Sequence, residues 1–417
     1  MSERPLAEPT APLDLLDERL RRGAGLRSAL TGILERIRSG DLGALPIIVG
    51  LLVIWTVFQA LNPVFLSSTN LVNLLMESVS VGVIALGVVC VLLVGQIDLS
   101  VGSVSGLSAA LTAVTFVEAG WPLPAAMAAA IGAGAAIGWV YAQMVTRLGV
   151  PSFVATLAGL LSFLGVQLWL LGDTGAVNLP YDSDLVHFAQ LAFVPAWLSY
   201  VLVVLAAGWL FATGYALART RRAAGLSARS TRLLVVRSAG LLAALGFAVW
   251  YLNRARGIGW MFVCFVGLVL ALNYALTRTG WGRSVFAVGG NAEAARRAGI
   301  NVRRVYTGAF VLCSSLAALG GLLAAARLAA ANQASGAGDV NLNAIAAAVI
   351  GGTSLFGGRG SAFAALLGIL VIQSISSGLT LLDLDSSFRF IVTGLVLALA
   401  VALDSAARRS RASHGRA

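Results

Sequence analysis

Lysine is absent from this sequence of 417 residues, and all 29 of its basic residues are arginines. The P-loop of nucleotide-hydrolysing proteins requires a lysine that reaches the phosphates of the nucleotide. The absence of lysine therefore excludes an ordinary nucleotide-hydrolysing site in this chain.

Histidine and cysteine are also scarce. His187 and His414 stand alone, and Cys90, Cys264 and Cys313 each lie inside an apolar run. Isolated cysteines in apolar runs behave as small buried hydrophobic residues rather than as disulfides or metal ligands. The apolar runs also lack paired acids and any nucleophile with a base. We therefore expect no metal site, no cofactor and no catalytic residues.

Charged residues make up only 11% of the chain, whereas hydrophobic residues make up 58%. A soluble domain averages about 25% charged residues, so this composition predicts a membrane protein. The net charge of +11 would suit a nucleic-acid partner, but the charges lie between apolar runs. We therefore expect the lipid membrane, and no nucleic acid, as a partner.

Apolar runs follow one another along most of the chain, and one membrane-spanning helix needs about 20 apolar residues. The pattern predicts an all-α polytopic membrane helical bundle with about 10–12 transmembrane segments and Gly-rich helix breaks. Residues 101–117 and 344–358 are short and rich in glycine, so each is either a full crossing or a half-helix. The other runs cover residues 45–62, 72–94, 122–146, 152–172, 191–217, 233–252, 258–277, 305–328, 361–382 and 387–405.

Three pairs of small residues have the four-residue spacing that allows helices to pack closely in lipid. These pairs are Gly132–Ala136, Gly134–Gly138 and Gly320–Ala324.

Two polar segments flank the predicted membrane domain, residues 45–405. Residues 1–44 carry leucines at helical spacing among arginines, which is typical of an amphipathic helix on the membrane surface or of a disordered tail. Residues 406–417 form a basic tail. With both termini in the cytoplasm, all but four of the 29 arginines lie on the inner side, as the positive-inside rule requires.

The segment 95–103, Gly-Gln-Ile-Asp-Leu-Ser-Val-Gly-Ser, interrupts an apolar stretch with a carboxylate. Broken helices in transporters place backbone dipoles beside the substrate pathway, and Ser100 or Ser103 are candidate caps of the following helix. The alternative is a short inner loop in which Asp98 is solvated or caps a nearby backbone group.

A second segment, 351–361, holds five glycines in eleven residues and resembles the first in closing with Gly-Ser before an apolar run. So many glycines make a regular helix unfavourable. The similarity suggests an internal duplication, as in some transporters. From the two breaks we predict these translocation-pathway residues: Gln96, Asp98, Ser100, Ser103, Thr353 and Ser354.

A third segment, 283–302, is a long loop between two runs. Asn291 is a favourable N-cap, Glu293 and Arg297 form an i,i+4 pair, and Gly299 is a natural helix stop. The spacing predicts a short helix between Asn291 and Ala298. Such a helix either transmits force from a soluble motor or is an ordinary surface helix.

These segments together resemble the permease subunits of monosaccharide ABC importers, a family that includes ribose, galactose, arabinose and xylose permeases. The motifs are 95–103, the Gly-Gly-Asn-Ala-Glu-Ala-Ala-Arg loop followed by Gly-Ile-Asn-Val (299–302), residues 344–361, and Val-Pro-Ser-Phe-Val-Ala-Thr-Leu at 150–157. The resemblance covers about residues 45–405. The chain is most similar to xylose-type members because it carries extra material around 217–257, although Gln96 stands where those members commonly have Glu.

The resemblance implies a non-catalytic subunit that carries a monosaccharide, D-xylose or another pentose, across a bacterial inner membrane. Ribose, another sugar or a polyol are the alternative cargoes. It implies a permease homodimer, a cytoplasmic ABC ATPase subunit and a periplasmic or lipid-anchored sugar-binding protein. The residues expected to couple to the ATPase are Gly290, Asn291, Glu293, Ala294, Ala295 and Gly299.

An ion-coupled secondary transporter is the alternative from another class. It requires carboxylates deep in the bundle, and only Glu77 and Asp98 are candidates. Glu77 lies near the outer end of its run, where it either lines a cavity or reaches toward the membrane surface.

Overall fold

The computed structural model describes residues 45–226, 228, 230–385, 387–388, 390–395, 398 and 402. The predicted N-terminal segment 1–44, the tail 406–417 and part of the run 387–405 lie outside the described residues. The described chain forms two compact units. One is Val194–Gly257, and the other is the remainder of the described residues, called the main unit below.

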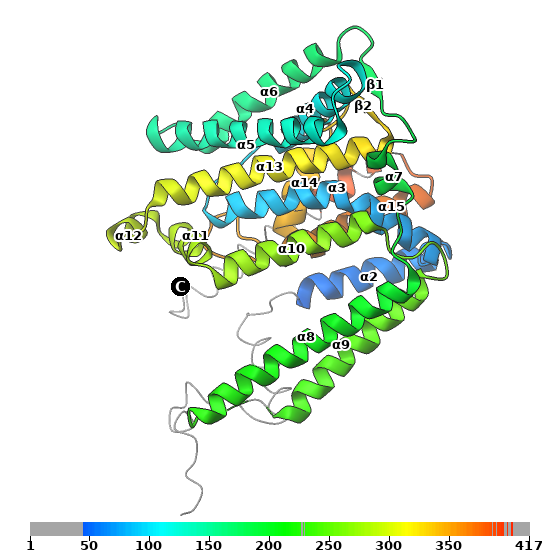
Figure 1. The fold of residues 1–417 in the computed structure, drawn as a ribbon, viewed down its shortest axis with the longest axis vertical. Coiled ribbons are helices and arrows are strands. Elements are labelled where there is room, and N and C mark those ends of the chain that lie inside the picture. The colour runs from blue at the N-terminus through cyan, green and yellow to red at the C-terminus, as the bar shows by residue number, and fades with distance from the viewer. Residues whose placement is uncertain are drawn as a thin grey trace, which may run out of the picture. The chain divides into compact units, whose positions relative to one another are not determined.

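The main unit is almost entirely helical (Figure 1). Its elements are α2 (Leu45–Leu61), α3 (Ser68–Leu93), α4 (Val101–Ala113), the π-helix η2 (Val114–Glu118), α5 (Leu123–Arg147), α6 (Ser152–Leu171), β1 (Ala176–Asn178), α7 (Asp184–Gln190), α10 (Trp260–Arg278), α11 (Gly280–Gly290), α12 (Ala292–Arg297), α13 (Val302–Leu328), β2 (Ala330–Asn332), α14 (Val340–Ile350) and α15 (Phe363–Leu381).

The predicted all-α membrane bundle is confirmed. Among the described residues, nine helices are long and apolar enough to cross a membrane. The run 101–117 forms α4 and η2, which together make one of these nine. The run 344–358 instead forms α14 with only 11 residues, about 16 Å of helix, so it is a half-helix.

Helix α13 is the centre of the main unit, where it packs against α3, α4 and α5 (Figure 1). Glycines allow this packing because the backbones approach closely. A Cβ atom added at Gly87 of α3 would lie 2.7 Å from the Cys313 carbonyl oxygen, and one at Gly134 of α5 would lie 2.6 Å from the Ser314 carbonyl oxygen. The small-residue pairs that begin at Gly134 and Gly320 therefore lie at helix contacts, whereas Gly132 faces open space.

A two-stranded antiparallel sheet closes one end of the main unit, with Val177 of β1 opposite Ala331 of β2. Gln167 at the end of α6 fixes this sheet, because its Nε2 donates hydrogen bonds to the carbonyl oxygens of Asn332 (3.1 Å) and Ser335 (2.9 Å).

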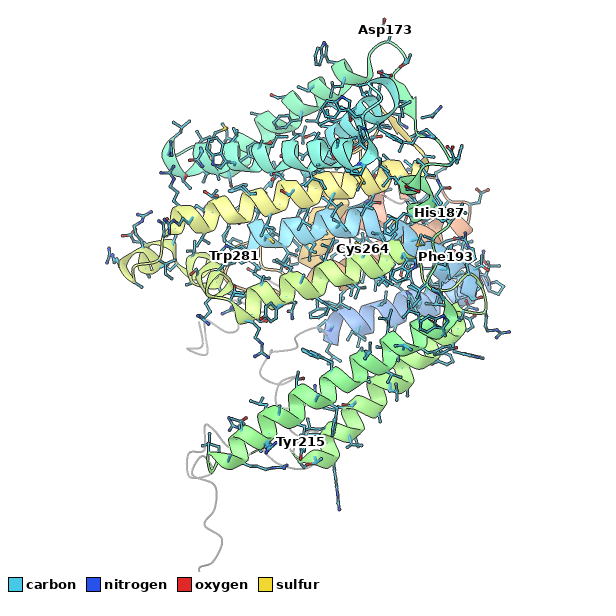
Figure 2. The ribbon with its side chains drawn as sticks, viewed as in Figure 1. Asp173, His187, Phe193, Tyr215, Cys264 and Trp281 are labelled. Atoms are coloured by element: carbon cyan, nitrogen blue, oxygen red, sulfur yellow. The ribbon has the colours of Figure 1, made fainter. Side chains whose placement is uncertain are left out.

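The scarce histidine and cysteine residues lie apart. Figure 2 shows His187 on α7 and Cys264 on α10. Cys90 and Cys313 are buried thiols, as expected, but Cys264 is exposed. The expectation of burial was wrong for Cys264 because its side chain points away from the packed faces of the bundle, where lipid surrounds a membrane helix.

The smaller unit is a helical hairpin of α8 (Ala196–Ala223) and α9 (Thr231–Leu252). Pro195 precedes α8, and the Ser230 hydroxyl caps α9 by accepting a hydrogen bond from the Leu233 amide at 3.3 Å. Asn253 Nδ2 donates to Ser199 Oγ at 3.1 Å and joins the end of α9 to the start of α8. This hairpin contains most of the extra material around 217–257.

Gly132 and Gly134, near the middle of α5, give a matched test of helix packing. We expect Gly134→Leu to destabilise the solubilised protein by about 1–3 kcal/mol or more, because the side chain meets the backbone of α13. Gly132→Leu, two residues away in open space, is expected to leave the melting temperature in detergent nearly unchanged. Equal melting curves for the two variants would contradict the close contact between α5 and α13.

Candidate functional site

The break between α3 and α4 is an extended segment that starts at a left-handed glycine. Helix α3 ends at Leu93, Gly95 adopts a φ of 73°, and α4 begins at Val101. A positive φ favours glycine because other residues place Cβ too close to the backbone. The break therefore leaves several backbone groups without partners from a helix.

Side chains from neighbouring helices bind these freed backbone groups. The amides of Ile97 and Leu99 donate to Ser152 Oγ (3.3 Å) and Thr156 Oγ1 (3.1 Å), which lie in the first turns of α6. The Leu99 carbonyl oxygen accepts a hydrogen bond from Asn341 Nδ2 of α14 at 2.8 Å. Two neighbouring helices, α6 and α14, thus hold the break in one conformation.

Asp98 is buried, with 2% of its surface exposed, so it is not a solvated loop residue. Its Oδ1 accepts hydrogen bonds from the Ser100 amide (2.8 Å) and the Ser100 hydroxyl (2.7 Å). Its Oδ2 has no hydrogen-bond partner among the described residues, although the Cys313 thiol of α13 lies close to the carboxyl group. Asp98 therefore fixes the turn into α4 and keeps one oxygen available.

Ser100 and Ser103 do not cap α4 as expected. Ser100 occupies the N-cap position, but its hydroxyl donates to Asp98 and accepts no bond from the helix. The Ser103 hydroxyl donates to the Ser100 carbonyl oxygen at 3.0 Å. Both residues are buried, and the Asp98 carboxylate binds the amide and hydroxyl of Ser100, the residue that precedes α4, rather than an amide of the helix.

Gln96, Thr353 and Ser354 lie outside this polar turn. Gln96 is half-buried, and its Nε2 donates to the Tyr306 hydroxyl of α13 at 3.4 Å. Ser354 Oγ accepts from the Phe356 amide at 3.3 Å, so it stabilises its own loop. Thr353 is buried with its hydroxyl unpaired among the described residues.

The two Gly-rich breaks meet each other and the end of α11 at one point. The Gly358 amide donates to the Leu93 carbonyl oxygen at 2.9 Å. A Cβ atom at Gly289 would collide with the same carbonyl oxygen, and one at Gly358 would lie 3.0 Å from the Gly290 amide nitrogen. We call the contact of Leu93, Gly95, Gly289, Gly290 and Gly358 the glycine junction.

Helix α12 follows the glycine junction directly and has the predicted local structure. Asn291 caps it by accepting from the Ala294 amide at 2.9 Å. Gly299, with a φ of 84°, ends it in a Schellman motif, in which the amides of Gly299 and Ile300 bind the carbonyl oxygens of Arg296 and Ala295. These bonds confirm the predicted start and stop of the short helix.

Most side chains of α12 are exposed. Glu293 pairs with Arg296 at 3.0 Å and with Arg297 at 3.3 Å, while Ala295 is buried against the bundle. Exposed ion pairs of this kind add little stability. The arrangement therefore presents a charged, pre-formed surface helix with one anchoring residue.

Glu77 is exposed on α3, and its Oε2 accepts a hydrogen bond from Gln373 Nε2 of α15 at 2.7 Å. Asp98 is thus the one buried carboxylate among the described residues.

Several residues of the site were not singled out from the sequence. Ser152 and Thr156 belong to the motif 150–157, but their hydrogen bonds to the break follow only from the packing of α6 on α4. Asn341 and Tyr141 carry no sequence pattern that distinguishes them. Tyr141 of α5 lies against α6 at Gly159, with its hydroxyl buried and unpaired among the described residues.

Comparison with known proteins matches the chain to permease components of transport systems. Residues 70–401 match the family described as the permease component of a branched-chain amino acid transport system. The xylose transport system permease protein XylH of Escherichia coli (strain K12) is 33% identical over 345 residues, which cover 83% of this chain and 87% of that protein.

Two further relatives extend the comparison. XylH of Haemophilus influenzae is 33% identical over 380 residues, covering 90% of this chain and 99% of that protein. The ribose import permease protein RbsC of Escherichia coli (strain K12) is 32% identical over 360 residues, covering 86% of this chain and 92% of that protein. No solved structure matches the chain significantly.

The turn at Asp98 predicts different effects of two substitutions. Asp98→Asn keeps the oxygen that accepts from Ser100, so we expect a melting temperature close to that of the unchanged protein. Asp98→Ala leaves the buried Ser100 amide unpaired, at a cost of about 1–3 kcal/mol. Thermal unfolding in detergent measures the stability of both variants. An Ala variant as stable as the Asn variant would show that the hydrogen bonds between Asp98 and Ser100 do not stabilise the turn.

Proposed function

The chain belongs to the permease family identified by these comparisons, and on this premise we propose that it is the translocation subunit of an ATP-driven monosaccharide importer. We propose a pentose as the cargo, with D-xylose first and ribose, another sugar or a polyol as alternatives. A cytoplasmic ABC ATPase subunit supplies the energy, and a periplasmic or lipid-anchored binding protein delivers the sugar. Two copies of the chain form the permease.

The membrane arrangement proposed here is multi-pass in a bacterial inner membrane with both termini in the cytoplasm. The end of α5 and the start of α13 lie together in the structure. Both carry arginines that the orientation scheme assigns to the inner side. This grouping supports placing the end of the bundle that bears α12 in the cytoplasm.

The observation that carries the proposed mechanism is the glycine junction. In this mechanism the ATPase docks on the exposed surface of α12, with Gly290, Asn291, Glu293, Ala294, Ala295 and Gly299 as the coupling residues. A displacement of α12 moves α11, and Gly289 and Gly290 press directly on Leu93 and Gly358. No flexible side chain lies between these backbones to absorb the movement.

Helices α4 and α14 are the elements that this displacement moves. Both begin or end at a Gly-rich break, and Asn341 of α14 already binds the Leu99 carbonyl oxygen before α4. Short helices next to breaks change their tilt without disrupting a long hydrogen-bond ladder. We propose that their movement opens and closes the sugar pathway.

Buried polar atoms around α4 support a pathway for a hydroxylated cargo. Asp98 Oδ2, Asn341 Oδ1 and Gln167 Oε1 are buried without hydrogen-bond partners among the described residues. Each such atom carries a cost of about 1–3 kcal/mol, which proteins accept mainly where a ligand or water later binds. A sugar offers many hydroxyl donors, so these acceptors suit it better than a branched-chain amino acid side chain.

Asp98, Ser100 and Ser103 are proposed as pathway residues beside these acceptors, together with Gln96, Thr353 and Ser354 at the two breaks. Within this set, Asp98 combines a fixed position with an unpaired oxygen. It is therefore the residue from which we expect the strongest effect of charge removal on transport.

The decisive experiment purifies the tagged chain from its native membranes in mild detergent and identifies co-purifying proteins by mass spectrometry. We expect a stoichiometric ATPase and a binding protein, and titration of the latter with xylose, ribose, a polyol and leucine then identifies the cargo. A chain that purifies alone and transports without ATP would favour the ion-coupled transporter. A binding protein selective for leucine would overturn the sugar assignment.

Charge reversal on α12 tests the coupling role. Glu293→Lys removes both ion pairs of α12 and repels basic groups, while the Asn291 cap and the Gly299 stop remain. We expect about tenfold weaker retention of the ATPase, the change that about 1.4 kcal/mol produces. Glu118→Lys, an exposed charge reversal at the end of η2, is the control. Equal retention in both variants would remove α12 from the ATPase contact.

A further inference from the structure

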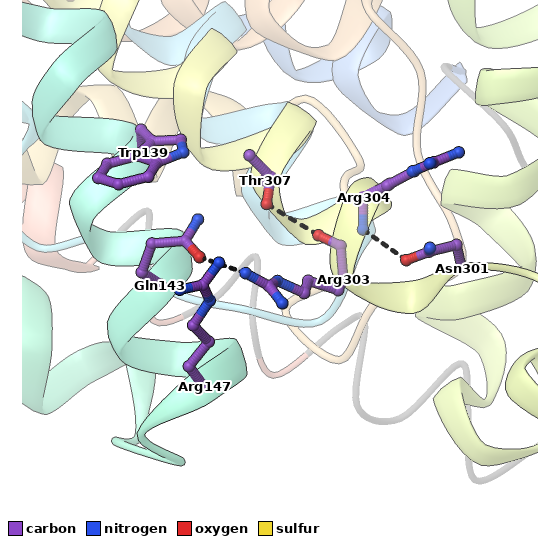
Figure 3. A pocket seen from close by; sticks show the side chains of 7 residues that line it. All are labelled: Trp139, Gln143, Arg147, Asn301, Arg303, Arg304 and Thr307. Carbon is purple, nitrogen blue, oxygen red and sulfur yellow. Dashed lines mark hydrogen bonds between the residues drawn. The ribbon is translucent and has the colours of Figure 1, made fainter.

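A basic pocket lies between α5 and α13, separate from the breaks and from α12 (Figure 3). Its volume is about 370 Å³, within the range of roughly 300–1,000 Å³ typical of small-molecule sites. The residues that line it are Trp139, Gln143, Arg147, Asn301, Arg303, Arg304 and Thr307.

The pocket lies beside the line of closest contact between the two helices. At Gly134 and Gly138, α5 lies against the backbone of α13. Trp139, Gln143 and Arg147 have four-residue spacing, so they share one face of α5. This face lies next to the buried glycine face, and the side chains on it border the pocket together with the first turns of α13.

The pocket concentrates positive charge. Two guanidinium groups, those of Arg147 and Arg303, lie together in it, whereas the Arg304 side chain points away from them (Figure 3), and no carboxylate lines the pocket. Arg303 is held in place because its Nη2 donates to Gln143 Oε1 at 2.8 Å, and Figure 3 shows the Arg147 guanidinium group beside this pair. Arginine groups this close repel one another, and a bound anion with several oxygens removes this repulsion and accepts their hydrogen bonds.

Along α5, the side chains that line the pocket change from charged to aromatic. Trp139 is eight residues from Arg147, which corresponds to about 12 Å along the helix. The Trp139 side chain is half-exposed, at 53% of its surface. Arginine at the end of a membrane helix and tryptophan two turns deeper match the phosphate and the glycerol region of a phospholipid. A free phosphate would use only the arginine end.

We propose that this pocket binds the phosphate of an anionic phospholipid, with Arg147 and Arg303 as ligands and Trp139 against the glycerol and upper acyl region. The lipid would bridge α5 and α13 and brace the start of α13. This site depends only on the membrane location of the chain, and it goes beyond the transport function.

The test compares lipid retention by the purified full-length chain in native mass spectrometry, with phosphatidylglycerol against phosphatidylcholine. The pocket variant is Arg147→Gln and Arg303→Gln together. The control variant, Arg219→Gln and Arg232→Gln, removes the same charge from exposed positions of α8 and α9. Neither sugar nor ATPase is present, so the result is independent of the proposed transport function.

We expect the unchanged chain and the control variant to retain phosphatidylglycerol in preference to phosphatidylcholine. The pocket variant should bind phosphatidylglycerol roughly 25-fold more weakly, because each arginine near an anionic lipid contributes about fivefold. If the double variant does not fold, Arg147→Gln alone should weaken binding about fivefold.

Three results would overturn the proposal. Equal loss in the pocket and control variants would indicate a general charge effect. Displacement of the lipid by millimolar inorganic phosphate would identify a free-anion site instead. Unchanged lipid retention in the pocket variant would show that its arginines do not bind the lipid phosphate.

Discussion

Direct backbone contact at the glycine junction is the constraint on which the rest of the site depends. The Gly358 amide binds the Leu93 carbonyl oxygen, and Gly289 lies so close to the same oxygen that no side chain fits between them. Three chain segments far apart in the sequence thereby meet without intervening side chains. Helices α3 and α11 end at this contact, so it fixes where the chain leaves each of them.

Helix α13 provides the fixed frame against which these elements are placed. It is buried against α3, α4 and α5 through glycine contacts, and its Cys313 lies beside the carboxyl group of Asp98. Interiors packed this closely respond to displacement by shifting whole helices rather than by deforming gradually. The short helices next to the breaks are therefore the parts of the main unit that are free to change position.

Much of the fold follows from sequence alone, because apolar runs and local caps are short-range signals. The helical runs and the α12 boundaries at Asn291 and Gly299 were predicted correctly. The tertiary hydrogen bonds were not predicted. Nothing in the sequence near Ser152, Thr156 or Asn341 indicates that these side chains bind the break between α3 and α4. The Ser100 cap was wrong because the Ser100 hydroxyl is oriented toward the buried Asp98 carboxylate, to which it donates, and accepts no amide of α4. Pathway and coupling roles remain predictions.

The composition of the glycine junction has a consequence for how solution conditions act on this protein. Its atoms are backbone amides, carbonyls and glycine Cα atoms, none of which titrates or carries a net charge. The close contact there is one of excluded volume, which salt does not screen. The exposed ion pairs of Glu293 on α12 lie within reach of dissolved ions. Ionic strength therefore acts on the surface of α12, while the backbone contact at the glycine junction is indifferent to it.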